Sequence, residues 1–184
     1  MPRVDRRALI ADTVIRTLAR EGSRGLTHRA IDTAAGLPAG STSYYLPSRA
    51  ALLTAAVERL AELDAADVAA LEEGDPVAAL TALVQAALVG EGRDRTLARY
   101  ELSLEAVRRP ELRRALSAGT SRLEAIVAER LTAASAPAAA AARARDLLAF
   151  VDGVLFSEVT GATAPPRSPG DVADAVRRAL QTSA

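Results

Sequence analysis

Apolar residues recur at helical spacing along almost the whole chain, and runs of alternating β-branched residues are missing. Near the N-terminus, Ala8, Ala11, Ile15 and Leu18 fall on one face of a helix expected over about residues 5–20. Ala, Leu, Arg and Glu dominate the composition, and all four favour helices. The pattern therefore predicts an all-α protein with about nine helices.

Two short helices are expected after the first one. Gly22, in the segment EGSRG, supplies a left-handed stop for the first helix. Thr27 is an N-cap for the second helix, which Gly36 ends. Pro38 is expected to open the third helix, because proline is tolerated in a first turn, and Pro47 to close it. The residues of the second helix expected to face inward are the apolar ones, Ala30, Ile31, Ala34 and Ala35.

A larger helical region follows these elements. Ser48 is expected to cap a long fourth helix that runs to about residue 71, and Asp75 and Pro76 to start the next one. The remaining helices are expected at roughly 76–90, 94–108, 110–133, 138–161 and 170–182. The pattern thus predicts two domains, residues 1–47 and residues 48–184, connected by the helix over 48–71.

The second and third helices, joined by AAGLP, have the spacing of a helix-turn-helix, whose second helix enters the DNA major groove. The third helix begins with small residues, so its backbone could lie close to base edges. Ala39 suits contact with a thymine methyl group, and Ser41 or Thr42 could donate to a base edge or a phosphate. Thr27 and Arg49 stand at helix starts, where N–H groups favour a phosphate.

Tyr44 and Tyr45 are two of only five aromatic residues in the chain, and they lie in polar surroundings. Their hydroxyl groups are suitable donors to DNA phosphates. We expect one ring to face DNA and the other to wedge against the first helix. The sequence leaves both assignments open.

The charge distribution supports a nucleic-acid partner. The net charge is zero, yet the first 50 residues carry +4 and the remainder −4, and every basic residue is Arg. A basic region on an acidic body is the electrostatic footprint of a nucleic-acid binder. The chain has no Cys, and its single histidine, His28, is expected to be exposed beside Arg29. This leaves little from which to build a metal site or a catalytic triad, so no enzyme activity, metal or cofactor is expected.

Two features concern the location of the chain. The longest apolar run is broken by Asp152 and is too short to cross a bilayer. The N-terminus is charged and lacks the apolar region of a signal peptide. We therefore expect a cytoplasmic protein without a membrane partner.

The stretch GLTHRAIDTAAGLPAGSTSYYLPSRAALL, together with the preceding helix, resembles the DNA-binding domain of the TetR family of transcriptional regulators. This resemblance implies an all-α homodimer whose second domain binds a small effector, which respaces the two recognition helices and releases the operator. It implies operator contacts from Thr27, Arg29, Ala39, Gly40, Ser41, Ser43, Tyr45 and Arg49. Arg29 is the best candidate for reading a guanine through two hydrogen bonds.

The sequence departs from the common pattern of the family at four positions. Many members have an aromatic residue in place of Ser43, His in place of Tyr45, Phe in place of Leu46 and Lys in place of Arg49. The absence of an aromatic residue at position 43 suggests that Tyr44 or Tyr45 provides a phosphate contact in its place.

The resemblance also implies that the last two long helices form the four-helix bundle of a homodimer, and LLAFVDGVLFSEVTG suits that role. An effector pocket is expected near four residues, Tyr100, Leu104, Phe150 and Asp152. Glu101 and Glu105 lie four apart on one helix face, as metal ligands or as ion-pair partners of Arg99, Arg108 or Arg109, and the second arrangement is favoured.

These features predict a repressor that a small molecule releases from its operator DNA. The alternative is a helical protein–protein adaptor with a vestigial DNA-binding module. The weak net charge and the absence of Asn, Gln or Lys from the third helix favour that alternative.

Overall fold

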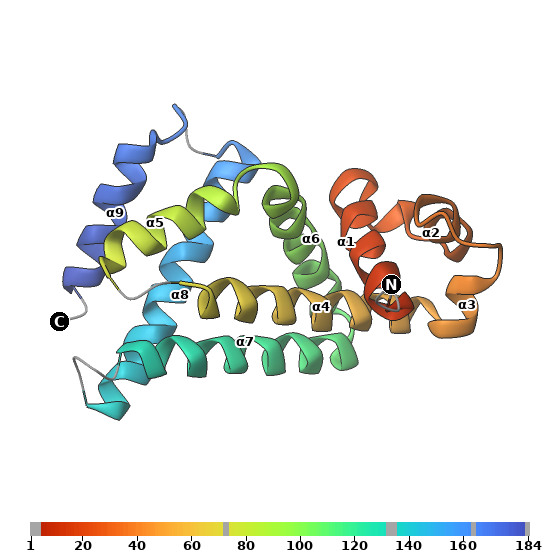
Figure 1. Cartoon of the computed structure of the whole chain (residues 1–184), viewed down its shortest axis with the longest axis horizontal. Coiled ribbons are helices and arrows are strands. Elements are labelled where there is room, and N and C mark those ends of the chain that lie inside the picture. Colours follow the sequence, from red (N-terminus) through yellow and green to blue (C-terminus); the bar gives the residue numbers. More distant parts are fainter. Residues whose placement is uncertain (1–4, 72–73, 132–135, 163–164, 183–184) are drawn as a thin grey trace. The chain divides into compact units, whose positions relative to one another are not determined.

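The computed structural model describes residues 5–71, 74–131, 136–162 and 165–182. Within these ranges the chain forms nine α-helices and no strand, as the hydrophobic pattern predicts (Figure 1). Their bounds are α1 (Arg6–Gly25), α2 (His28–Ala34), α3 (Ser41–Tyr45), α4 (Arg49–Ala69), α5 (Pro76–Ala86), α6 (Gly90–Val107), α7 (Pro110–Leu131), α8 (Pro137–Thr160) and α9 (Pro169–Thr182). No helix in the described part of the chain is long and apolar enough to cross a membrane.

The chain divides into two compact units. The first unit contains residues up to 63 together with 94–119, and the second contains 64–93 together with the residues from 120 onward. This division differs from the domains expected at 1–47 and 48–184. The reason is that the core around α1 also takes side chains from α4, α6 and α7, so no compact unit ends at residue 47.

Local sequence signals set most helix ends. Thr27 accepts a hydrogen bond from the Ala30 N–H at 3.1 Å, Ser48 from Ala51 at 3.1 Å, and Asp75 from Val77 at 2.9 Å, so the three expected N-caps are confirmed. Gly22, expected to end the first helix, has a positive φ of 65° with a ψ of −171° and interrupts α1 without ending it, since the helix continues to Gly25.

The start of the third helix differs from the sequence expectation. Pro38 does not open it. The Ser41 N–H instead donates to the Pro38 carbonyl at 3.1 Å, which closes a turn, and α3 begins at Ser41. Gly40 stands at the N-cap with a φ of 87°, a left-handed conformation that glycine adopts without a side-chain penalty.

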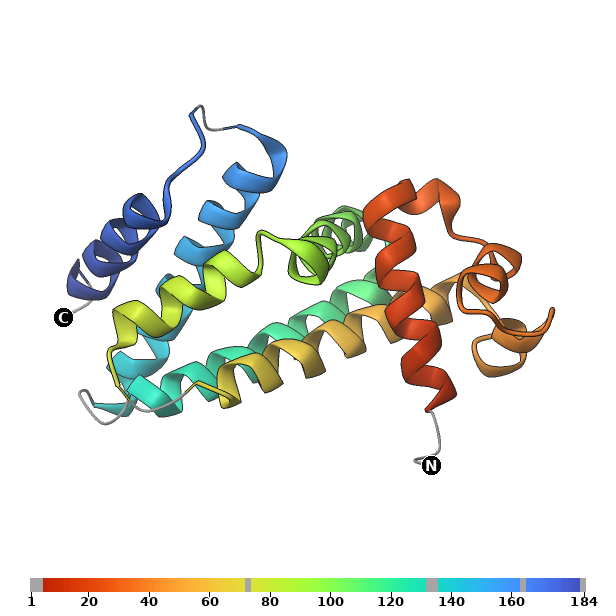
Figure 2. The ribbon, with the colours of Figure 1, turned by 45° about the horizontal axis from the view of Figure 1, so that its top comes forward.

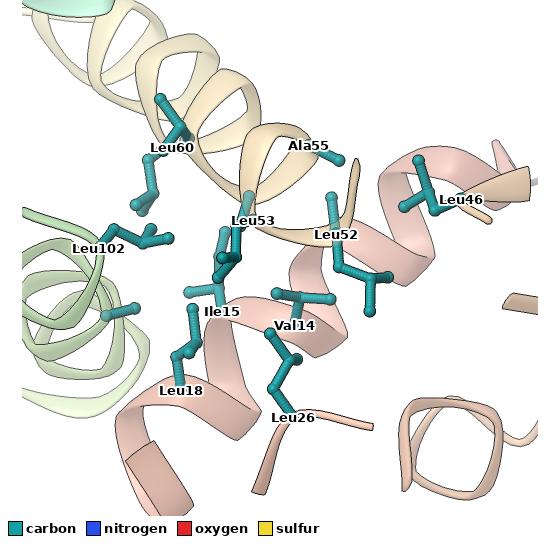
Figure 3. Close-up of a cluster of buried hydrophobic side chains, with 14 of the residues drawn as sticks. Val14, Ile15, Leu18, Leu26, Leu46, Leu52, Leu53, Ala55, Leu60 and Leu102 are labelled. Atoms are coloured by element: carbon teal, nitrogen blue, oxygen red, sulfur yellow. The ribbon is translucent and has the colours of Figure 1, made fainter. Parts of the chain in front are cut away.

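The core of the first unit forms where α1 crosses α4. Val14, Ile15 and Leu18 of α1 point toward Leu52, Leu53 and Leu60 of α4, and Leu102 of α6 joins them (Figure 3). On α7, a Cβ at Gly119 would lie 3.1 Å from that of Ala61, so glycine allows the close approach of α7 to α4. This packing gives the short helices α2 and α3 a rigid base.

The second unit has a smaller core. Val84 of α5, Val154 of α8, and Val172 and Val176 of α9 are buried together, and Phe150 packs against them. Helices α5, α8 and α9 can be followed in Figure 2. Arg167, two residues before α9, forms an ion pair with Glu158 of α8 at 2.8 Å.

Candidate nucleic-acid interface

Helices α2 and α3 are each fixed to the core by a few buried side chains. Ile31 anchors α2, and Leu46, which directly follows α3, is also buried. Ala30 and Ala35 are only half-buried and Ala34 is exposed, so α2 turns fewer residues inward than expected. The outer faces of both helices are consequently free to meet a partner.

Most of the expected DNA-contacting residues lie on the surface of α2, α3 and the turn between them. The exposed ones are Thr27, Arg29, Ala39, Gly40, Ser43, Tyr44 and Tyr45. Ser41 is half-buried, and its hydroxyl group donates to the Pro38 carbonyl at 2.6 Å. The surface thus offers a guanidinium group, hydroxyl groups and a small, close-approach region at residues 39 and 40.

The two tyrosines differ in exposure. Tyr44 is 83% exposed and Tyr45 is 37% exposed. Their rings meet edge to face, with centroids 5.1 Å apart and an interplanar angle of 89°. This is a favourable aromatic geometry, in which one ring supports the other. Tyr44 is therefore the ring that projects further from the protein.

No exposed carboxylate interrupts this surface between residues 27 and 48, all of which the structure describes. The only acidic residue in that range is Asp32, and it is 5% exposed. Arg29 is exposed in the same range. A polyanion approaching α2 and α3 therefore meets a cation and neutral donors, without a like charge among these residues.

The position of Thr42 differs from the sequence expectation. It was expected to reach a base edge or a phosphate, but it is fully buried. Its hydroxyl group donates to Asp32 Oδ1 at 2.6 Å and its N–H donates to the same oxygen at 2.8 Å. The Thr42 side chain therefore holds α3 to α2 and does not lie on the outer surface.

Asp32 is a functional candidate that the sequence does not single out, because it is one of four acidic residues within the basic first 50 residues. Its second oxygen, Oδ2, accepts from the Gly40 N–H at 2.7 Å. The hydrogen bond from the Thr42 hydroxyl group, followed by those from the Thr42 and Gly40 N–H groups, lowers the pKa of the Asp32 carboxyl group below its usual range. The only signal in the sequence was an acid beside Ile31, on the side of α2 expected to be buried.

Arg49 also lies differently from the expectation of a phosphate contact. Its Nη1 donates to the Leu26 carbonyl at 2.7 Å, and its Nη2 donates to the Ser23 carbonyl at 2.5 Å and to Ser23 Oγ at 2.7 Å. The guanidinium group therefore ties the start of α4 to the connection between α1 and α2.

His28 was expected to be exposed beside Arg29, but it is half-buried. Its Nε2 lies 2.8 Å from the Leu46 carbonyl oxygen. Because a carbonyl oxygen only accepts, this ring nitrogen carries the proton and donates. His28 therefore contacts the far end of α3 from inside the first unit.

The chain is similar to known proteins along most of its length. Residues 72–182 match the family model described as the C-terminal domain of tetracycline repressor-like proteins. The structure of a TetR-family member from Streptomyces coelicolor A3 is 30% identical, with a TM-score of 0.74, and the match covers 95% of this chain and 98% of that one. The chain belongs to the TetR family of transcriptional regulators.

Two further solved structures share the TetR fold. Multidrug binding protein EbrR in complex with ethidium is 29% identical, with a TM-score of 0.72, and the match covers 95% of this chain and 98% of that one. A transcriptional regulator from Rhodococcus sp. Rha1 is 21% identical, with a TM-score of 0.79 and coverage of 96% and 95%. No curated protein sequence matches the chain.

The four residues expected around an effector pocket of this TetR-family chain are divided between the two units. Tyr100 and Leu104 lie on α6 in the first unit, and Phe150 and Asp152 lie on α8 in the second. Leu104 and Asp152 are exposed, whereas Phe150 is half-buried against the core of the second unit. The grouping of these four residues therefore stays a prediction.

A separate shallow groove of about 350 Å³ lies between α5 and α9 in the second unit. Thr81, Gln85 and Arg177 are among the residues that line it, and none of the four expected pocket residues does. Arg177 also forms an ion pair with Asp174 on its own helix.

Glu101 and Glu105 of α6 connect this helix to the end of α1 within the first unit. Glu105 forms the expected ion pair with Arg109, at 2.8 Å, and accepts from Ser23 Oγ at 2.8 Å. The Arg109 hydrogen bond, followed by that of Ser23, lowers the pKa of the Glu105 carboxyl group. Glu101 accepts from the Ser23 N–H at 3.3 Å. The carboxylates thus serve in hydrogen bonds to α1 and in an ion pair along α6.

Proposed function

We propose that this TetR-family chain is a homodimeric repressor that binds a pseudo-palindromic operator through α2 and α3 and leaves it when a small molecule binds. The observation that carries this proposal is the outer surface of α2 and α3. It combines the exposed Arg29, hydroxyl groups and the small residues Ala39 and Gly40, and its single carboxylate is buried. This is the chemistry by which a helix reads the major groove between two phosphate strands.

Within this proposal the exposed residues take different roles. Arg29 reads a guanine through N7 and O6, and Ala39 packs against a thymine methyl group. Gly40 lets the backbone approach the bases. Ser43 and the Tyr44 and Tyr45 hydroxyl groups donate to the DNA backbone. Thr27 and Ser41 lie at the edges of the same surface. Thr42 and Arg49 are left out because their donors serve contacts inside the protein.

The proposed effector site and dimer interface belong to the helices after α3. Homodimerisation is assigned to α8 and α9. Effector binding is assigned to α6, which carries Tyr100 and Leu104, and to α8, which carries Phe150 and Asp152. Structural relatives of the chain have been solved with ethidium, proflavin and choline. These three compounds are organic cations, and they are our first candidates for the effector class.

DNA binding is tested by titrating the protein against the DNA upstream of its own gene and against random duplex, at several salt concentrations. A regulator should prefer one fragment by about a thousandfold or more, and its affinity should fall linearly with salt on logarithmic axes. Equal affinity for every fragment would exclude operator recognition. Capture of a stoichiometric protein partner without DNA would favour the adaptor function.

Effector binding is tested by thermal unfolding with a panel of organic cations and matched neutral compounds. A ligand at about 100 times its Kd stabilises the native state by about 2.7 kcal/mol, which gives a clear rise in Tm. The same ligand should release the preferred DNA fragment. A compound that raises Tm and leaves the DNA complex intact would contradict a role as inducer.

A further inference from the structure

We propose that Asp32 and His28, four residues apart on α2, hold α3 at its two ends, and that Asp32 is a positioning residue for operator recognition. This inference rests on the proposed function, since it concerns the helix that would enter the DNA. Neither residue is among those expected to touch DNA. Their effect would come through the placement of α3.

Helix α3 cannot hold its own position. It has only five residues, and helices of this length are unstable alone because the cost of forming the first turn is not recovered. Its N-cap, Gly40, provides no side chain to accept the first N–H groups. A helix in this situation takes its orientation from the contacts that its ends make with the rest of the protein.

At the N-terminal end of α3, Asp32 takes the place of the missing side-chain cap. Its two oxygens accept from the Gly40 N–H, the Thr42 N–H and the Thr42 hydroxyl group, at 2.7, 2.8 and 2.6 Å. Asp32 and Thr42 are both buried, so water does not compete for these bonds. Because the Thr42 side chain is one of the partners, the contact also decides which side of α3 faces inward.

At the C-terminal end of α3, His28 donates from Nε2 to the carbonyl oxygen of Leu46, the C-cap residue. His28 and Asp32 are one helical turn apart, so they lie on the same face of α2. The acid meets the N–H end of α3 and the imidazole meets its carbonyl end, which matches the polarity of the helix. Ile31, fully buried between them in sequence, fixes α2 to the core.

The placement matters because the outer residues of α3 are positioned through the inward contacts of the same short helix. Ser43 and Tyr44 are exposed and follow Thr42 directly. If Asp32 released Gly40 and Thr42, the start of α3 could fray, and Ala39 and Gly40, the residues proposed to approach the bases there, would shift. The proposed DNA-backbone contacts come from hydroxyl groups further along α3, so they depend less on the exact position of the helix start. Loss of the Asp32 contacts should therefore reduce selectivity more than general DNA affinity.

The first test uses Asp32→Asn, which keeps the size of the side chain but turns one acceptor oxygen into a donor. We expect its affinity for the preferred fragment to fall at least tenfold, while its affinity for random duplex changes less than twofold. The control is Leu60→Ala, which loosens the same core away from α3. If the two variants lose equal selectivity at equal loss of Tm, or if Asp32→Asn keeps its selectivity, the inference is wrong.

The second test measures amide hydrogen exchange without DNA, and so does not depend on operator binding. In the wild type the Gly40 and Thr42 amides should be protected, and in Asp32→Asn they should exchange at least tenfold faster relative to the amides of α4. Unprotected Gly40 and Thr42 amides in the wild type would overturn the inference. A wild type that selects no DNA fragment would instead contradict the proposed function. The exchange measurement alone would then decide whether Asp32 holds the start of α3.

If Asp32→Asn does not fold, His28→Phe provides the second variant. It keeps an aromatic ring but removes the donor to Leu46. We expect faster exchange at the end of α3 and a loss of selectivity smaller than that expected for Asp32→Asn. If His28→Phe has the same amide exchange rates and the same DNA selectivity as the wild type, α2 does not hold α3 at this end.

Discussion

Arg29 and Arg49 have the same side chain and opposite surroundings. Arg29 is exposed on α2, whereas the Arg49 guanidinium group has three hydrogen bonds inside the first unit. The planar guanidinium group, with its five N–H donors, suits both a base edge and a set of carbonyl oxygens. The two residues should therefore respond to substitution in different measurements.

Arg29→Ala should cost about 1–3 kcal/mol of binding to the preferred fragment and relax the preference at one base pair, because a two-bond contact to guanine is lost. The measurement is a titration against fragments mutated one base pair at a time. Arg29→Lys keeps the charge but not the paired donors. It should therefore keep the wild-type affinity for random duplex and lose the preference at that base pair. A uniform loss at all base pairs would assign Arg29 to the DNA backbone.

Arg49→Ala should lower the free energy of unfolding by about 1–3 kcal/mol even without DNA, because the carbonyl oxygens of Ser23 and Leu26 lose their donor. Denaturant unfolding followed by circular dichroism measures the change. The control is Arg24→Ala, an exposed arginine of the same segment, which should stay within about 0.5 kcal/mol of the wild type. Equal stability of the two variants would contradict the role of Arg49 as an internal tie.

At the scale of elements, the hydrogen bonds at the start of α3 give this region a defined pH dependence. The pKa of Asp32 is lowered by Thr42 and Gly40, so the charged form stabilises the folded state. This contribution is complete at neutral pH and is lost as the pH falls through the lowered pKa. Wild type and Asp32→Asn should therefore differ in stability at neutral pH and converge in acid. Urea unfolding at a series of pH values tests this, and a constant difference would contradict it.

Most helix ends could be predicted from the sequence because their signals are local. Thr27, Ser48 and Asp75 cap helices through bonds to residues two or three positions away. The start of α3 could not be predicted in this way. Its cap comes from Asp32, ten positions before Thr42 and on another helix, so the position of Pro38 was misleading.

The candidate DNA surface was predicted mainly by composition and by resemblance to the TetR family. Thr27, Arg29 and Tyr44 are among the expected residues that are exposed, and their contacts with DNA stay a prediction. The inward-facing groups were harder to predict. Arg49 and Thr42 look like DNA-binding residues in the sequence, and only folding brings them next to Ser23 and Asp32. A polar side chain near a binding helix can serve the helix itself, and the sequence does not separate the two uses.

At the scale of the whole molecule, the proposed binding to a pseudo-palindromic operator needs two copies of α3, which makes dimerisation the next property to test. Phe156 of α8 is a large apolar side chain and is 49% exposed. If α8 and α9 form the proposed interface, Phe156→Arg should give a monomer by sedimentation and weaken operator binding strongly. Val89→Arg, at an exposed apolar residue between α5 and α6, is the control. If Phe156→Arg stays dimeric, the dimer interface does not include Phe156.

The edge-to-face pair of Tyr44 and Tyr45 gives the molecule a built-in optical reporter. The chain has no tryptophan and three tyrosines, and two of these three tyrosines lie on α3. Stacking or hydrogen bonding to nucleotides would quench their fluorescence. Titration of the unlabelled native protein could therefore follow engagement of this helix directly, with the remaining tyrosine, Tyr100, as an internal baseline.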